Sequence, residues 1–229
     1  MIKKLSKKAS LLSALVLTMA LFAGCSNEKE NQKVADIEVK TIATKELQDK
    51  LSDDSWVVVD TRINDAFNGW KLDEVERGGH IKGAVDFSAN WLTVDSKDKE
   101  KTLDKALETK GIEKDKNIVL YDANGKDAKE VANYLSEKGY KNLYTYNVAD
   151  WAKDESLPME SYENYEMIVP ATIVNDILDG KKPETFENSK NIKIVEASWG
   201  EESEAYSKGH VPTSVHINTD TVEPPPQWM

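Results

Sequence analysis

The fold is decided by residues 117–135, whose sequence reads NIVLYDANGKDAKEVANYL. The four apolar residues 118–121 are typical of a short strand that is buried on both faces within a parallel sheet. A polar loop with one glycine follows, and the next apolar residues recur at helical spacing: Ala128, Val131, Ala132 and Leu135. Strand, short loop and helix form the unit that places ligands at the carboxyl end of a parallel sheet.

The loop between this strand and this helix consists of Asp122, Ala123, Asn124, Gly125, Lys126 and Asp127. Its backbone N–H groups and the amino end of the helix together favour an anion. Asp122 is itself negative, so we expect its carboxylate to occupy that position and to stabilise the helix. General acid–base chemistry is the weaker interpretation of Asp122, because the sequence places no histidine or second carboxylate beside it.

Composition excludes several functions. Hydrophobic residues make up 39% of the 229 residues, which is enough to form a hydrophobic core. The formal net charge is −11, so we do not expect the protein to bind nucleic acid through its phosphates. The single cysteine permits no intramolecular disulfide and no cysteine-based metal site. The three histidines, His80, His210 and His216, show no metal-ligand spacing. We therefore predict neither a metal nor a cofactor.

The amino terminus has the pattern of a secretory signal. Lys3, Lys4, Lys7 and Lys8 precede the apolar run 11–22, which is too short to span a membrane. The following Ala23-Gly24-Cys25 resembles a bacterial lipobox, with Phe22 where that pattern usually has leucine. We expect residues 1–24 to be a signal peptide, Cys25 to be lipidated, residues 25–41 to be a tether, and the protein to lie on the extracytoplasmic face of a bacterial membrane. The alternative is a plain signal peptide followed by a chance cysteine.

Helical and extended segments alternate along the rest of the chain. Strands are predicted at 56–59, 118–121 and 143–146, and helices at 44–51 (with Thr44 as a possible N-cap), 64–70 (helix or turn) and 98–110. Residues 150–160 look irregular. This order predicts an α/β fold with a parallel sheet flanked by helices.

The same alternation of helices and strands begins again after residue 164. A helix is predicted at 170–178 and a strand at 192–195, and the segment 209–215 echoes 79–85 at an offset of 130 residues. That period is typical of tandem domains. We expect a complete domain at 42–160 and the first half of a second domain at 166–229.

Three motifs together resemble a rhodanese domain: Val58-Val59-Asp60-Thr61-Arg62, Gly79-His80-Ile81-Lys82-Gly83-Ala84, and the strand–loop–helix unit. The repeat and the segment 223–228 (EPPPQW) resemble the two-domain thiosulfate and 3-mercaptopyruvate sulfurtransferases. The resemblance implies transfer of sulfane sulfur to a thiophilic acceptor, carried as a persulfide on a loop cysteine whose thiolate is the nucleophile.

The sequence departs from the family at that loop. The family loop reads roughly Cys-x-x-Gly-x-Arg; Gly125 matches, but Asp122 stands at the cysteine position and Asp127 at the arginine position. The second copy ends before its own loop, so we expect a carboxyl-terminal truncation and a chain that is inactive alone. A phosphatase of related fold would need the same cysteine. The alternative is a non-catalytic binding or regulatory module on the cell surface, with a small anion or a protein as partner.

The resemblance gives the remaining motif residues supporting roles. Asp60 and Arg62 are expected to orient neighbouring loops by ion pairing and hydrogen bonds. His80 is expected to hydrogen-bond the loop network and to cap the end of the strand that contains Asp60. Five tryptophans are expected in core or interdomain packing: Trp70, Trp91, Trp151, Trp199 and Trp228.

Overall fold

The computed structural model describes residues 39–201 and 204–223. The predicted signal peptide, Cys25 and the tether up to residue 38 lie outside the described residues, as does the proline run 224–226. Within the described part of the chain, no helix combines the length and apolarity needed to cross a membrane.

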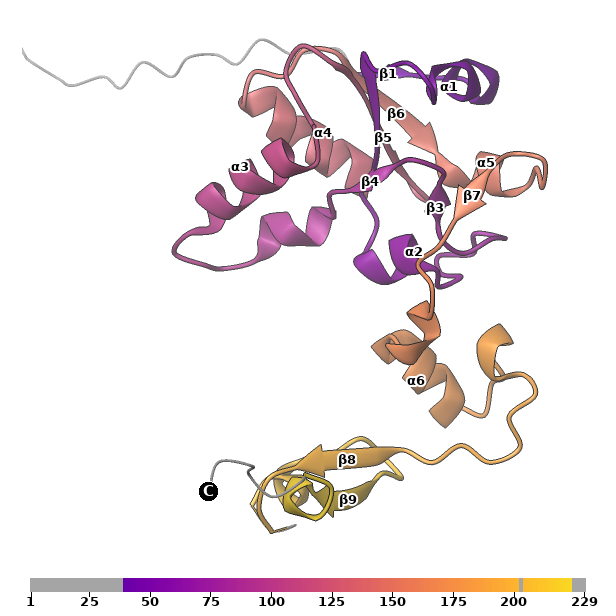
Figure 1. The fold of residues 1–229 in the computed structure, drawn as a ribbon, viewed down its shortest axis with the longest axis vertical. Helices are drawn as coiled ribbons and strands as arrows, with labels where there is room; N and C mark the ends of the chain where they lie inside the picture. The colour runs from indigo at the N-terminus through magenta and orange to yellow at the C-terminus, as the bar shows by residue number, and fades with distance from the viewer. Residues whose placement is uncertain (1–38, 202–203, 224–229) are drawn as a thin grey trace, which may run out of the picture. The chain divides into compact units, whose positions relative to one another are not determined.

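A five-stranded parallel sheet forms the centre of the domain (Figure 1). Its order is β1 (Lys40–Thr41), β6 (Leu143–Asn147), β5 (Asn117–Asp122), β2 (Trp56–Asp60) and β4 (Val85–Asp86). The predicted parallel sheet is therefore confirmed. β1 falls within the last residues of the predicted tether, so the sheet begins earlier than the expected domain start at residue 42.

β5 is the central strand because it is the most apolar. The side chains of residues 118–121 are fully buried, and the strand pairs with β2 on one edge and with β6 on the other. Asp60 of β2 lies opposite Tyr121 of β5. The carboxyl ends of these neighbouring strands thus meet at one edge of the sheet, where ligands bind in this class of fold.

Helices cover both faces of the sheet. On one face, α3 (Lys99–Thr109) and α4 (Asp127–Glu137) contribute Leu103, Leu107, Val131 and Leu135 to the core. On the other face, α1 (Thr44–Lys50) and α5 (Val148–Ala152) contribute Leu47, Trp151 and Ala152. The predicted helices at 44–51 and 98–110 are confirmed. The remaining elements of this part are α2 (Asn64–Asn68), β3 (His80–Ile81), β7 (Met159–Glu160) and the 3-10 helix η1 (Ala89–Thr93).

The prediction that residues 150–160 are irregular holds only for residues 153–158, because α5 extends to Ala152 and β7 covers Met159–Glu160. Asn147 begins α5, because its side-chain Oδ1 accepts the N–H of Ala149 at 2.9 Å. The guanidinium of Arg77 then donates to main-chain carbonyls at and beyond the end of that helix, including those of Trp151 and Ala152. β7 pairs in antiparallel fashion with β3. These partners are distant in sequence, so no local pattern revealed them.

Thr44 does not cap its helix. Ala43 occupies the N-cap position without a side-chain hydrogen bond, and the Thr44 hydroxyl instead lies 2.9 Å from the Tyr146 hydroxyl of β6. Threonine is a suitable N-cap residue, but the hydroxyl group of Thr44 hydrogen-bonds to Tyr146, which is distant in sequence.

The carboxyl-terminal part holds α6 (Ala171–Leu178) and a two-stranded parallel sheet of β8 (Val195–Ser198) and β9 (Val215–Asn218). β8 begins at the last residue of the predicted strand 192–195, so that prediction was displaced towards the amino terminus. Four 3-10 helices complete this part: η2 (Tyr165–Met167), η3 (Glu184–Phe186), η4 (Tyr206–Lys208) and η5 (Thr219–Thr221).

The tryptophans divide by position. Trp70 and Trp151 are buried, and Trp91 packs partly buried against the core on the α3–α4 face. Trp199 is 71% exposed, so its assignment to packing was wrong for the described structure. Trp228 lies outside the described residues.

Candidate functional site

Asp122 ends β5 and its carboxylate is held by the loop that follows. Oδ1 accepts the N–H of Gly125 at 2.6 Å, and Oδ2 accepts the N–H of Ala128 at 2.9 Å. The side chain is buried, with 1% of the residue exposed. The N–H groups that the loop offers to an anion are therefore used by a carboxylate of the protein itself.

The loop needs glycine at position 125. Gly125 has a φ of +76°, in the left-handed region, and a Cβ added there would meet nothing within 4 Å. Position 125 therefore favours glycine because of its backbone conformation and not because a larger side chain would lack space. The neighbouring Asn124 supports the same turn, because its Oδ1 accepts the N–H of Lys126 at 2.9 Å. Ala123 is half-buried and packs against the core on the α1–α5 face.

Asp127 adds a second carboxylate at the first residue of α4. Burial, together with the nearby charge of Asp122, raises the pKa of the Asp127 carboxyl above its ordinary value. A loop that would favour an anion by its backbone thus carries two acidic side chains.

Asp60 and Arg62 form a buried bidentate pair. Arg62 Nε donates to Asp60 Oδ1 at 3.0 Å, and Arg62 Nη2 donates to Asp60 Oδ2 at 2.6 Å. The same Nη2 donates to the main-chain carbonyl of Gly79 at 2.7 Å, so the pair holds the turn that precedes β3. Both residues were predicted to orient loops, and these are contacts of that kind.

Tyr121 belongs to this network although the sequence suggested only a core residue. Its hydroxyl accepts the N–H of Ile81 at 3.2 Å, and its ring centroid lies 5.6 Å from the guanidinium carbon of Arg62. Burial, reinforced by the charge of Asp60, raises the pKa of the Tyr121 hydroxyl well above its ordinary value. Tyr121 therefore stays protonated, and its hydroxyl group links β5 to β3 by a hydrogen bond.

His80 is buried in a different environment from the one predicted. Its Nδ1 lies 2.7 Å from the carbonyl oxygen of Phe67, and its ring stacks on the Phe67 ring with centroids 3.8 Å apart. Nε2 lies 3.5 Å from Glu160 Oε1. His80 thus contacts the end of α2 and β7, and the expectation that it caps the Asp60 strand was wrong.

The motif residues lie on opposite faces of the sheet and do not form one site. Side chains of successive strand residues point to opposite faces. Asp122 bonds to α4 on the face where Leu120 packs, whereas Tyr121 faces Arg62 and Ile81 on the other. The Asp60–Arg62 pair is therefore not placed to assist chemistry at Asp122.

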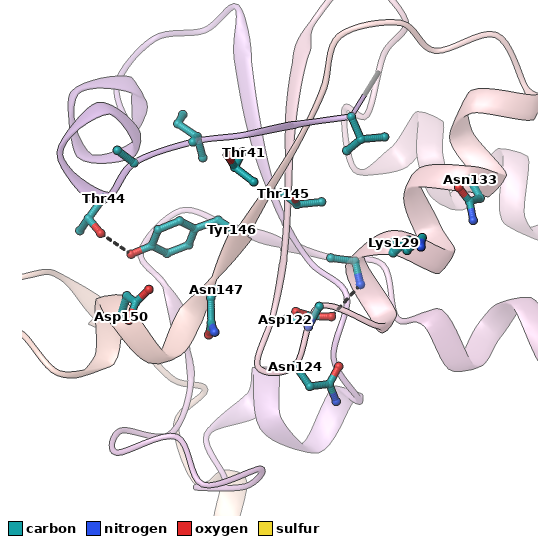
Figure 2. Close-up of a pocket in the computed structure, with 15 residues that line it drawn as sticks. Thr41, Thr44, Asp122, Asn124, Lys129, Asn133, Thr145, Tyr146, Asn147 and Asp150 are labelled. Carbon is teal, nitrogen blue, oxygen red and sulfur yellow. Dashed lines mark hydrogen bonds between the residues drawn. The ribbon is translucent and has the colours of Figure 1, made fainter. Parts of the chain in front are cut away.

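A cleft of about 850 Å³ opens beside loop 122–127 (Figure 2). Figure 2 shows Asp122 and Asn124 at the loop, with Lys129 and Asn133 presented by α4. Among the described residues, neither Lys129 nor Asn133 makes a side-chain hydrogen bond or ion pair. The remaining polar lining comes from β1, α1, β6 and α5: Thr41, Thr44, Thr145, Tyr146, Asn147 and Asp150. No sequence motif predicted this cleft, because its lining residues come from three separate stretches of the chain: 39–44, 122–133 and 145–150.

A resident metal is not indicated by the described side chains. The described ranges contain no group of three or more histidine, cysteine, aspartate or glutamate residues that could hold a metal ion.

Comparison with known protein families gave a match to part of the chain. Residues 43–151 match the model of the rhodanese-like domain family. Comparison with curated proteins gave no match.

Similar solved structures include the wild-type structure of EanB, with 30% identity, a TM-score of 0.70, and coverage of 82% of this chain and 42% of that chain. Another is the anaerobic ergothioneine biosynthesis enzyme from Chlorobium limicola in complex with its natural substrate trimethyl histidine, with 30% identity, a TM-score of 0.70, and coverage of 82% and 43%. A third is an EanB variant with ergothioneine covalently linked to a persulfide cysteine, with 30% identity, a TM-score of 0.69, and coverage of 80% and 41%. The chain thus spans less than half the length of these relatives.

Proposed function

We propose that residues 43–151, which form a rhodanese-like domain, act as a non-catalytic binding module tethered to a bacterial membrane through lipid on Cys25. One observation carries the proposal: the Asp122 carboxylate accepts the N–H groups of Gly125 and Ala128, where the family places its sulfur-carrying thiolate. A carboxylate cannot form a persulfide. The only cysteine of the sequence is Cys25, at the predicted lipidation site.

A protein partner is favoured over a small anion as the ligand. The loop's N–H donors are already used by Asp122, and the cleft beside it is lined by two carboxylates, Asp122 and Asp150, against one lysine. Lys129 and Asn133 on α4 line the cleft with polar side chains that can bind a partner protein (Figure 2). A cleft of this size, whose walls expose both polar and apolar groups, suits a peptide segment better than an inorganic ion.

The second candidate is sulfur transfer itself, from thiosulfate or 3-mercaptopyruvate to a thiophilic acceptor. The observation in its favour is the similarity, at 30% identity, to an enzyme crystallised with a persulfide cysteine. On this hypothesis the thiolate must come from outside residues 43–151. It would attack the sulfane sulfur of thiosulfate, forming a sulfur–sulfur bond and releasing sulfite.

The test is a sulfurtransferase assay of the purified protein with thiosulfate and cyanide, and with 3-mercaptopyruvate. We expect no turnover from the wild-type protein or from Cys25→Ser. Asp122→Cys in the Cys25→Ser background is the positive control, because mass spectrometry should find one added sulfur atom on that thiol after incubation with thiosulfate. Turnover that survives Cys25→Ser would overturn the non-catalytic proposal.

A further inference from the structure

The loop after β5 contains an exposed Asn-Gly pair, Asn124-Gly125. In such a pair the main-chain nitrogen of the glycine can attack the side-chain amide carbon of the asparagine and displace ammonia, because the two groups are held together by the chain. Glycine permits this attack since it has no side chain to shield its nitrogen. A second pair, Asn68-Gly69, ends α2, and its glycine is buried. The sequence contains no other Asn-Gly pair.

Two features of the loop prepare Asn124 for this reaction. A Cβ added at Gly125 would meet nothing within 4 Å, so the loop is open around the attacking residue. The Oδ1 atom of Asn124 accepts the N–H of Lys126 at 2.9 Å. This donor is placed to stabilise the negative charge that develops on Oδ1 when the amide carbon is attacked. The amide of Asn124 is therefore polarised towards reaction.

One contact opposes the reaction. The Gly125 nitrogen must lose its proton before it attacks, and its N–H donates to Asp122 Oδ1 at 2.6 Å. A hydrogen bond to a carboxylate stabilises the protonated nitrogen, and the charge of the carboxylate disfavours an anionic nitrogen beside it. Asp127, the first residue of α4, adds a second negative charge to the loop. The loop thus combines a polarised amide with a nitrogen that is held in its unreactive form.

The pair Asn68-Gly69 is held in a different way. The N–H of Gly69 donates to the main-chain carbonyl of Asp65 at 3.3 Å, and a Cβ added at Gly69 would lie 2.4 Å from the ring of Tyr165. Tight packing therefore protects this pair. Its reactivity reports on opening of the fold and not on the state of loop 122–127.

We propose that Asn124 is a deamidation site and that the carboxylate of Asp122 slows its reaction in the folded protein. Hydroxide removes the amide proton of Gly125, and the nitrogen then bonds to Cγ of Asn124. The bond from Cγ to Nδ2 breaks, and Nδ2 takes a proton from water and leaves as ammonia, which regenerates hydroxide. Water hydrolyses the resulting cyclic imide at either carbonyl and gives aspartate or isoaspartate at position 124.

Either product changes the cleft beside the loop. Asn124 lines that cleft, so its conversion to an acid adds a carboxylate there (Figure 2). Isoaspartate also inserts an extra carbon atom into the main chain between Asp122 and Gly125, whose hydrogen bond closes the turn. Deamidation therefore makes the cleft more acidic and alters the turn. The proposal does not depend on which ligand the cleft binds.

The test is incubation of the purified protein at mildly alkaline pH, followed by peptide mass spectrometry. The measurement separates asparagine, aspartate and isoaspartate at positions 68 and 124. Wild type, Asp122→Ala and Asp122→Asn are compared, each folded in buffer and unfolded in guanidinium chloride. Asn68 is the internal control in every sample, because unfolding of the whole domain exposes both Asn-Gly pairs.

We expect Asn124 to react more slowly in the folded wild type than in the unfolded protein. Asp122→Ala should speed the reaction of Asn124 in the folded protein by about ten- to a hundred-fold, the range equivalent to one hydrogen bond to a charged group. Asp122→Asn keeps a side-chain oxygen without the charge and should have a smaller effect. The rate at Asn68 should change little in either folded variant.

An Asn124 rate that Asp122→Ala leaves unchanged would overturn the proposal. A lowered rate would overturn it as well, because the carboxylate would then be acting as a base. Equal acceleration at Asn68 and Asn124 would assign the effect to unfolding of the domain and would contradict a local role of Asp122. Should the alanine variant fail to fold, the comparison of wild type with Asp122→Asn decides in the same way.

Discussion

The Oδ2 atom of Asp122 accepts the main-chain N–H of Ala128 at 2.9 Å, so one carboxylate joins the end of β5 to the first turn of α4. The other oxygen accepts the N–H of Gly125. The loop N–H groups of Gly125 and Ala128 therefore have an acceptor that belongs to the protein itself. The loop has the backbone geometry of an anion-binding loop, but its N–H groups donate to Asp122 and thereby stabilise the turn.

Asp122→Ala should destabilise the domain by about 1–3 kcal/mol, because two N–H groups at a buried turn lose their acceptor. Asp122→Asn keeps one side-chain oxygen and should lose less. Urea unfolding followed by far-UV circular dichroism measures both. An alanine variant as stable as the wild type would show that water replaces the carboxylate without cost.

Asp122→Cys, made with Cys25→Ser, should give a thiol with a pKa below its ordinary value of about 8.5, because the loop N–H groups and the start of α4 stabilise a thiolate. Asp127 opposes this effect by its charge. Adding Asp127→Asn should therefore lower the thiol pKa further. The rate of alkylation by iodoacetamide against pH reports each pKa. A thiol that titrates near its ordinary value in both variants contradicts an anion-favouring loop.

Asp127→Asn alone should stabilise the protein at neutral pH. The pKa of Asp127 is raised in the folded state by burial and by Asp122, so its ionisation is easier in the unfolded chain and favours unfolding. The gain should be present above the folded pKa and should disappear as the pH falls below the ordinary value of 3.8, where both states are protonated. Unfolding free energies from pH 3 to pH 7 test the sign.

Arg62→Met should cost about 3–5 kcal/mol, because it leaves the buried carboxylate of Asp60 without its partner. The double variant Asp60→Asn/Arg62→Met removes that unpaired charge and should recover part of the loss. Urea unfolding of the wild type, both single variants and the double variant gives the coupling energy. A double variant that loses the sum of the two single losses would show that the pair is not coupled.

Membrane attachment at Cys25 remains a prediction, since the residue lies outside the described part of the chain. The protein should partition into the detergent phase on phase separation. Cys25→Ser should move it to the aqueous phase, because the lipid is its expected anchor. Unchanged partitioning of the serine variant would place the anchor elsewhere.

The sequence predicted the fold where local patterns are strong. The apolar run 118–121 became the central strand, and the residues at helical spacing from Ala128 to Leu135 all lie within α4. Each of these elements is specified by its own residues. Asp122 likewise carried its own signal, because its position after a buried strand and before a helix leaves a carboxylate few other partners.

The features that failed are set by distant partners. Tyr121 reads as the end of an apolar run, yet its hydroxyl bonds to Ile81, 40 residues away. Thr44 reads as a cap, yet it pairs with Tyr146, 102 residues away. The cleft combines residues from three separate stretches of the chain, so no window of sequence contains its pattern.

Among the described strands β1 pairs with β6 alone, and the Thr145 hydroxyl donates to the carbonyl of Lys40, which lies 105 residues earlier in the chain. During synthesis, β1 therefore cannot pair until β6 has been translated. At 5–20 residues per second, the delay is roughly 5–20 s of synthesis. During that interval β2, β4 and β5 can already pair with one another, but Lys40 and Thr41 lack β6, so this edge is completed last in a growing chain.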